Sequence, residues 1–101
     1  GAMGKDAQLM LLQADLGLMR ISASQQQYFT ALLAQSAAEL QRKGIRLQND
    51  APEDDTLIAS LAAWKYRVRT QAASPAMPEM IRSAIRDRQL HQVTAPEVQD
   101  G

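Results

Sequence analysis

The chain has 101 residues, a formal net charge of zero and 46% hydrophobic residues, which suits one domain with a modest core. It has no cysteine, which excludes a disulfide framework and a cysteine-ligated metal site. No segment approaches the roughly 18 uninterrupted apolar residues of a membrane span, so we expect no part of the chain in a membrane.

The first predicted helix runs from Lys5 to Leu16. Residues 1–4 have the character of a remnant from tag cleavage and are left outside the predicted fold. Leu9 and Leu12 recur at helical spacing on one face, together with the last leucine of the segment. Gly17 follows where a left-handed residue commonly ends a helix, so we expect the helix to stop there.

The second predicted helix has the most regular pattern in the chain. Ser24 and Gln27 stand three residues apart, as in a capping box that opens a helix. Apolar residues then repeat at helical spacing on one face, beginning with Phe29, while polar side chains occupy the other face. Gly44 is predicted to end the helix as a left-handed cap, and Ile45 to tuck back under the core.

The third predicted helix is the one on which the rest of the fold is built. Pro52 and the acids at 53–55 suit a first helical turn, because proline needs no partner for an N–H there and acids favour the helix dipole. The helix is expected to end near Thr70. Trp64, the only tryptophan, lies in its apolar stripe. Tyr66 lies about half a turn from that stripe, and is predicted to be either a surface tyrosine or an anchor for a partner chain.

The last predicted helix begins at Pro78 and ends near Gln92, after an Ala/Ser/Pro connector at 71–77. The segment 94–101 has no periodicity and is predicted to be a flexible tail. The apolar face of the last helix is predicted to comprise Met80, Ile81, Ala84 and Ile85.

These elements predict an all-α protein, with a single domain over residues 1–101 and a compact bundle of about four helices followed by the flexible tail. No segment alternates convincingly with the period of two that a strand requires. The predicted core comprises Phe29, Leu33, Leu40, Leu57, Leu61, Trp64, Val68, Ile81 and Ile85.

Basic residues gather in the second half of the chain. Residues 60–92 contain six bases and two acids, although the whole chain is neutral. Arg82 and Arg86 lie opposite the apolar face of the last helix, at i, i+4 spacing. Arg88 falls within the apolar sector, so either its stem lies along the core or its guanidinium meets an acid on another element. The predicted surface for a subunit, portal or DNA contact comprises Tyr66, Arg67, Arg69, Arg82, Arg86 and Arg88.

The sequence offers no convergent set of catalytic groups. His91 is the only histidine and has no evident partner, so we assign it to solvent or to the end of a helix. The acids at 53–55 are explained by the helix dipole without a metal ion. Glycines are few and scattered, so no loop that cradles phosphate is predicted. We therefore expect no enzyme activity, no catalytic residue, no cofactor and no metal.

A helix-turn-helix is not predicted either. The candidate junctions at 44–52 and 71–77 are longer than its three- or four-residue turn, and both contain proline. Sequence-specific readout of DNA is therefore not expected. A weak, non-specific attraction to a phosphate backbone stays open, through Arg82, Arg86 and the end of the third helix.

Four pieces of sequence, in this order, carry a family resemblance. They are Leu-Gln-Ala-Asp-Leu-Gly-Leu at 12–18, a helix that ends Glu-Leu-Gln-Arg-Lys-Gly-Ile at 39–45, the segment 53–69 with its Ala-Ala-Trp-Lys-Tyr-Arg-Val-Arg end, and Met-Pro-Glu-Met-Ile-Arg-Ser-Ala-Ile-Arg-Asp-Arg-Gln at 77–89. Together they resemble the small head–tail connector, or adaptor, proteins of tailed bacteriophages and prophages. The resemblance covers roughly residues 9–90.

The resemblance implies a structural protein of the virion, located at the head–tail interface and in the host cytoplasm during assembly. Members of that family form a homo-oligomeric ring of about a dozen copies beneath the portal protein. The ring also meets tail or stopper proteins and surrounds the DNA exit channel, where non-specific contact with passing DNA stays open. The family has no active site and no cofactor, and its C-terminal segment engages the portal, here from Val93 onward.

A function from another class stays open beside this one. The alternative is a small oligomeric helical regulatory module that binds DNA or protein, which we would expect to be a dimer with a sequence preference. A scaffolding or packaging subunit is a third reading, and the lack of a long heptad run counts against it.

Overall fold

The computed structural model describes residues 2–48, 51–70 and 76–100, with side-chain surroundings for 6–48, 51–70 and 76–91. Over these residues the chain contains helices and no strand, so the predicted all-α fold of four helices is confirmed. The helices are α1 (Ala2–Asp15), α2 (Ala23–Arg42), α3 (Pro52–Thr70) and α4 (Glu79–Asp100).

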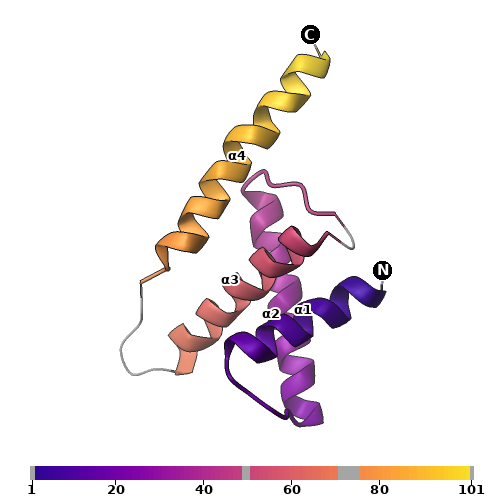
Figure 1. Ribbon diagram of the computed structural model, residues 1–101, viewed down its shortest axis with the longest axis vertical. Coiled ribbons are helices and arrows are strands. Elements are labelled where there is room, and N and C mark those ends of the chain that lie inside the picture. Colours follow the sequence, from indigo (N-terminus) through magenta and orange to yellow (C-terminus); the bar gives the residue numbers. More distant parts are fainter. Residues whose placement is uncertain (1, 49–50, 71–75, 101) are drawn as a thin grey trace.

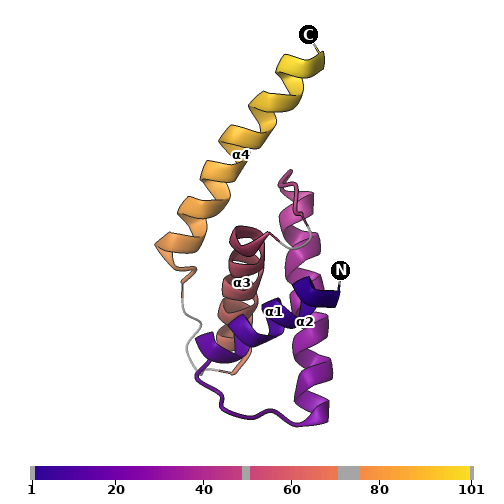
Figure 2. The ribbon, with the colours of Figure 1, turned by 45° about the vertical axis from the view of Figure 1, so that its right-hand side comes forward.

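α3 is the helix against which the other three pack. α1 and α2 lie on α3 and also contact each other, while α4 meets the bundle mainly through α3. Figures 1 and 2 show α4 running past the other helices, so that its C-terminal end projects beyond them. The central place predicted for the third helix is therefore confirmed, with the bounds Pro52 and Thr70 as expected.

Most of the predicted core is buried. A continuous apolar cluster joins all four helices, and Phe29 and Leu61 within it have no exposed surface. Ile45, predicted to tuck under the core from the connector after α2, is only 2% exposed. The predicted core residues that the structure buries are Phe29, Leu33, Leu40, Leu57, Leu61, Ile81 and Ile85.

Two predicted core residues, Trp64 and Val68, lie at the edge instead. Trp64 is half-buried and packs against the core from its rim, and Val68 is half-buried outside the core cluster. The prediction that both are core residues is wrong. The buried side of α3 is rich in alanine, with Ala62 and Ala63 fully buried, so the neighbouring helices approach its backbone closely there. Close packing leaves no room for an indole at the centre.

Both glycine caps are confirmed. Gly17 has φ 73° and Gly44 has φ 89°, the left-handed conformation that a helix end favours in glycine. After α1, the N–H of Leu18 donates to the carbonyl of Gln13 at 3.0 Å. After α2, the N–H of Ile45 donates to the carbonyl of Leu40 at 3.1 Å in the same way. These are Schellman motifs, and each returns the next apolar residue to the core.

The capping box of α2 lies two residues earlier than predicted. The Ser22 hydroxyl accepts from the N–H of Gln25 at 3.1 Å, and the Gln25 side-chain oxygen accepts from the N–H of Ser22 at 2.9 Å. Both Ser22 and Ser24 are followed three residues later by glutamine, so the local pattern is ambiguous. Ile21 packs against the core and fixes the point at which the chain enters the helix.

Two helices are longer than predicted. α1 begins at Ala2 and not at Lys5, so the backbone of the presumed tag remnant is helical. α4 continues to Asp100, so the predicted end near Gln92 is wrong. Extending a formed helix avoids the cost of nucleation, and Pro96 is the only strong helix breaker in the added segment. Gly101 and residues 71–75 of the predicted connector lie outside the described residues.

Candidate functional site

The structure separates the six residues of the predicted contact surface into two groups. Tyr66, Arg67, Arg69 and Arg88 all make contacts within the chain. Arg82 and Arg86 are exposed on α4. Four of the six predicted contact residues therefore have partners on other helices of the same subunit.

Tyr66 belongs to an aromatic cluster and not to an isolated surface position. Its ring meets the ring of Phe29 edge-on, with centroids 5.2 Å apart, and lies 6.1 Å from the ring of Tyr28. Such tilted contacts are the favoured geometry for aromatic pairs. Tyr66 is half-buried against the core, so the prediction of a surface tyrosine is wrong, because half a turn from the apolar stripe still faces α2. Its role as an anchor for a partner chain stays a prediction.

Arg67 and Arg69 hold other elements to α3. The Arg67 guanidinium donates to the Asp15 carboxylate at 2.9 Å and to the Asp15 backbone carbonyl at 2.7 Å, at the C-terminal end of α1. A cation there complements the helix dipole. The Arg69 guanidinium lies 5.5 Å from the centre of the Tyr28 ring, a cation–π distance. Both arginines have structural partners inside the subunit.

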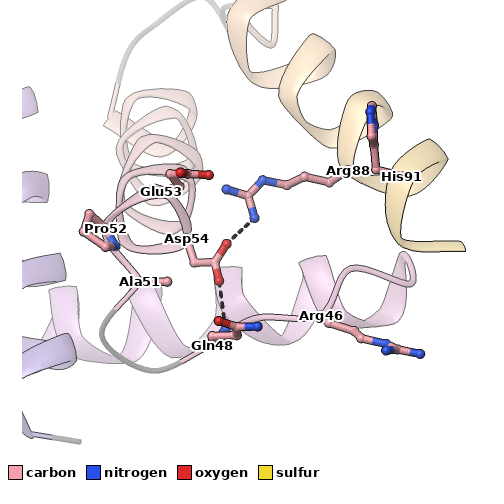
Figure 3. A pocket seen from close by; sticks show the side chains of 8 residues that line it. All are labelled: Arg46, Gln48, Ala51, Pro52, Glu53, Asp54, Arg88 and His91. Carbon is pink, nitrogen blue, oxygen red and sulfur yellow. Dashed lines mark hydrogen bonds and ion pairs between the residues drawn. The ribbon is translucent and has the colours of Figure 1, made fainter. Parts of the chain in front are cut away.

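Arg88 meets an acid on another element, one of the two alternatives that the sequence left open. Its guanidinium donates to the carboxylate of Asp54 in the first turn of α3. The other oxygen of Asp54 accepts the N–H of Gln48 at 2.8 Å. Figure 3 shows Asp54 between these two partners. The Asp54 side chain is 9% exposed and that of Arg88 17%, so this ion pair is largely removed from water.

The acids at the start of α3 do more than favour a helix dipole. Asp54 and Asp55 are both buried, and Asp55 accepts a hydrogen bond from the side-chain amide of Gln8 on α1 at 2.9 Å. This role of the two acids was not predicted from the sequence. A signal was present, because Asp54 precedes the buried Ile58 by four residues and so shares its face of the helix.

A cleft of about 450 Å³ opens beside the Asp54–Arg88 pair, between α4 and the connector that leads into α3 (Figure 3). Asp54 and Arg88 in its lining are engaged with each other, and the ring nitrogen of His91 lies 2.8 Å from the Asp87 carbonyl of its own helix. No nucleophile faces a base in it. Its lining comprises Arg46, Gln48, Ala51, Pro52, Glu53, Asp54, Arg88 and His91.

The apolar face predicted for α4 is only partly buried. Met80 is 81% exposed, although the sequence placed it with Ile81 and Ile85. Its position is about a third of a turn away from theirs, beyond the strip that α3 covers. Arg82 is more than half exposed and lies 3.9 Å from Glu79 of its own helix. Arg86 is exposed and forms no ion pair with any residue that the structure describes.

Comparison with known proteins found no match among family models, curated proteins or solved structures. Within the described part of the chain, no three His, Cys, Asp or Glu side chains are grouped so that they could hold a metal ion. None of the helices there is both long and apolar enough to cross a membrane.

Proposed function

We propose that this protein is a non-enzymatic structural subunit that forms the ring connecting the portal of a phage head to the tail. In this proposal the ring surrounds the DNA exit channel, and its partners are further copies of the chain, the portal protein, and tail or stopper proteins. The resemblance of residues 9–90 to head–tail connector proteins supports it.

The observation that carries the proposal is that long apolar side chains are exposed in two separate places. One group is Met10 at 70% exposure on α1 and Met19 at 93% after it, and the other is Met80 at 81% and Leu90 at 65% on α4. α1 and α4 both pack on α3 and lie apart from each other (Figures 1 and 2). A ring needs two different surfaces on each subunit, because its contacts are heterologous.

A mixing experiment tests this arrangement. The variants Met10→Glu/Met19→Glu and Met80→Glu/Leu90→Glu each place charge on one of the two exposed groups. We expect each variant alone to be monomeric by mass photometry under conditions in which the wild type assembles. Mixed in equal amounts, they should form dimers and no larger species, because each pair retains one intact contact.

The variant Gln27→Glu provides a control, because Gln27 is exposed on α2 and belongs to neither group. It should assemble like the wild type. A wild-type dimer that never grows larger, with or without portal protein, would overturn the ring and would favour the regulatory module instead. That outcome would be strengthened by a preference for one DNA sequence.

Truncation after Gln92 tests the contact with the portal. The contacts of α4 with the bundle described above, through Ile81, Ile85, Arg88 and Gln89, all precede that point. We therefore expect the shortened chain to melt within a few degrees of the full chain, but to lose co-sedimentation with the portal protein. Normal completion of heads by the truncated chain would show that the segment after Gln92 is dispensable.

A further inference from the structure

We infer that the end of α2 and one side of α4 together form a binding surface for the phosphate backbone of double-stranded DNA. We name this the α2–α4 basic surface, and it comprises Arg42, Lys43, Arg82 and Arg86. All four side chains are exposed. The inference deepens the proposed function and rests on it for the identity of the polyanion.

One contact brings the two pairs of cations together. The side-chain amide of Gln89 on α4 donates to the backbone carbonyl of Lys43 at 3.1 Å, directly after the end of α2. Arg82, Arg86 and Gln89 stand at positions i, i+4 and i+7, and therefore lie on one stripe of the helix. The side of α4 that carries the two arginines is thus the side that faces the end of α2. The sequence alone does not show this proximity, because 38 residues lie between Lys43 and Arg82.

Two of the acids near the α2–α4 basic surface pair with other cations. Glu39, one turn before Lys43, pairs with Lys65 of α3. Asp54 pairs with Arg88. Three exposed acids remain: Glu79 at 3.9 Å from Arg82, Asp87, which lies a quarter turn or more from Arg86, and Glu53 beside Asp54. Four exposed cations against three exposed acids leave the surface positive, although the whole chain is neutral.

The chemistry of these side chains fits a phosphate backbone and not the edges of bases. Arg42, Lys43 and Arg86 form no ion pair with a described residue, so binding a phosphate breaks no existing pair. Positively charged side chains that contact only phosphates position a protein on DNA without reading its sequence. The described part of the surface includes no aromatic side chain on which an unpaired base would stack. We therefore assign it to duplex DNA, bound without sequence preference.

Salt dependence of binding to a short fluorescent duplex tests the surface. Each phosphate that the protein neutralises contributes about −0.9 to the slope of log K against log salt concentration. With four cations engaged, the wild-type slope is expected near −3.6, which is about −0.9 per contact. The variants Arg42→Gln/Lys43→Gln and Arg82→Gln/Arg86→Gln should each make the slope shallower by about 2, since each removes two contacts.

A charge-matched control separates the surface from net charge. Arg20→Gln/Arg69→Gln removes two exposed cations near the other end of α2, where Arg69 lies over Tyr28. This variant should keep the wild-type slope. An equal change in all three double variants would overturn the inference, because binding would then follow total charge. A change in the α4 variant alone would also overturn it, because the surface would not include α2.

Circular dichroism and mass photometry on the same samples keep the outcomes distinct. The Arg42/Lys43 and Arg82/Arg86 variants should melt at the wild-type temperature, since their substituted side chains are exposed. Arg20→Gln/Arg69→Gln should stay folded but melt slightly lower, because it removes the contact of Arg69 with the Tyr28 ring. No binding by folded wild-type protein at low salt, while rings form, would overturn the DNA surface and leave the proposed connector standing. DNA binding that depends on all four cations in a protein that never assembles would support the surface and overturn the connector.

Discussion

Replacing Phe29 with alanine is expected to lower the free energy of unfolding by about 3–5 kcal/mol, the usual cost of emptying an aromatic core site. Phe29 has no exposed surface and joins the core of α2 to Tyr66 on α3. Domains of this size have total stabilities of about 5–15 kcal/mol. The variant should therefore be marginally folded, as measured by guanidinium unfolding followed by circular dichroism.

Trp64→Ala is the matched comparison, because the sequence alone would place the critical aromatic residue there. Trp64 is half-buried at the rim of the core, so part of its surface is already in water in the native state. We expect its replacement to cost clearly less than that of Phe29. A larger cost for Trp64→Ala would show that the centre of the core lies at the indole.

Replacing Arg88 with alanine should cost about 3 kcal/mol, at the low end of the range for breaking a buried ion pair. The Asp54 carboxylate would lose its guanidinium while keeping the N–H of Gln48 as a partner. A buried charge without its counter-charge is costly because water no longer solvates it. Unfolding of α4 from the bundle should accompany the loss, since Arg88 is its main polar contact with α3.

Two further variants identify the cause of that loss. Asp54→Leu combined with Arg88→Met removes both charges and should be close to the wild type in stability, because apolar replacements of buried pairs are often neutral. Arg67→Ala breaks a pair with Asp15 whose side chains are 38% and 36% exposed, and should cost about 1 kcal/mol or less. If Arg67→Ala destabilises as much as Arg88→Ala, burial is not the reason.

The ends of α1 and α2 and the start of α3 could be predicted from the sequence because their signals are local. Gly17 and Gly44 take the left-handed conformation that their place after an apolar run suggests. Pro52 opens α3 as its missing N–H predicts. Where two local signals overlap, as at Ser22 and Ser24, the sequence alone does not choose between them. Contact of Ile21 with the core, a tertiary feature, decides in favour of Ser22.

The depth of a residue was harder to predict than its secondary structure. Periodicity predicted that Trp64 and Val68 lie on the buried side of α3. It does not show how far along α3 the neighbouring helices extend, and so does not show which residues on that side they cover. The burial of Asp54 and Asp55 was not predicted, because the helix dipole already explains acids in a first turn without any tertiary partner. Their partners, Arg88 and Gln8, come from distant segments of the chain.

The internal partners of the predicted contact residues could not be predicted for the same reason. Periodicity shows which side of a helix a charge occupies, but not whether another element already holds it. Asp15 holds Arg67 and Tyr28 faces Arg69, and neither pairing can be derived from spacing along the chain. Conversely, Arg42 and Lys43 come near the basic side of α4 only in the folded chain, where Gln89 of α4 contacts the Lys43 carbonyl.

The dependence of α4 on α3 has a consequence for cooperativity. α1, α2 and α3 contact one another in all three combinations, whereas α4 adds its contacts mainly through α3. Such an arrangement makes α4 a separate foldon, whose detachment requires less free energy than global unfolding. Detachment would open the Asp54 end of α3 and the apolar strip under Ile81 and Ile85, while the three-helix unit stays folded.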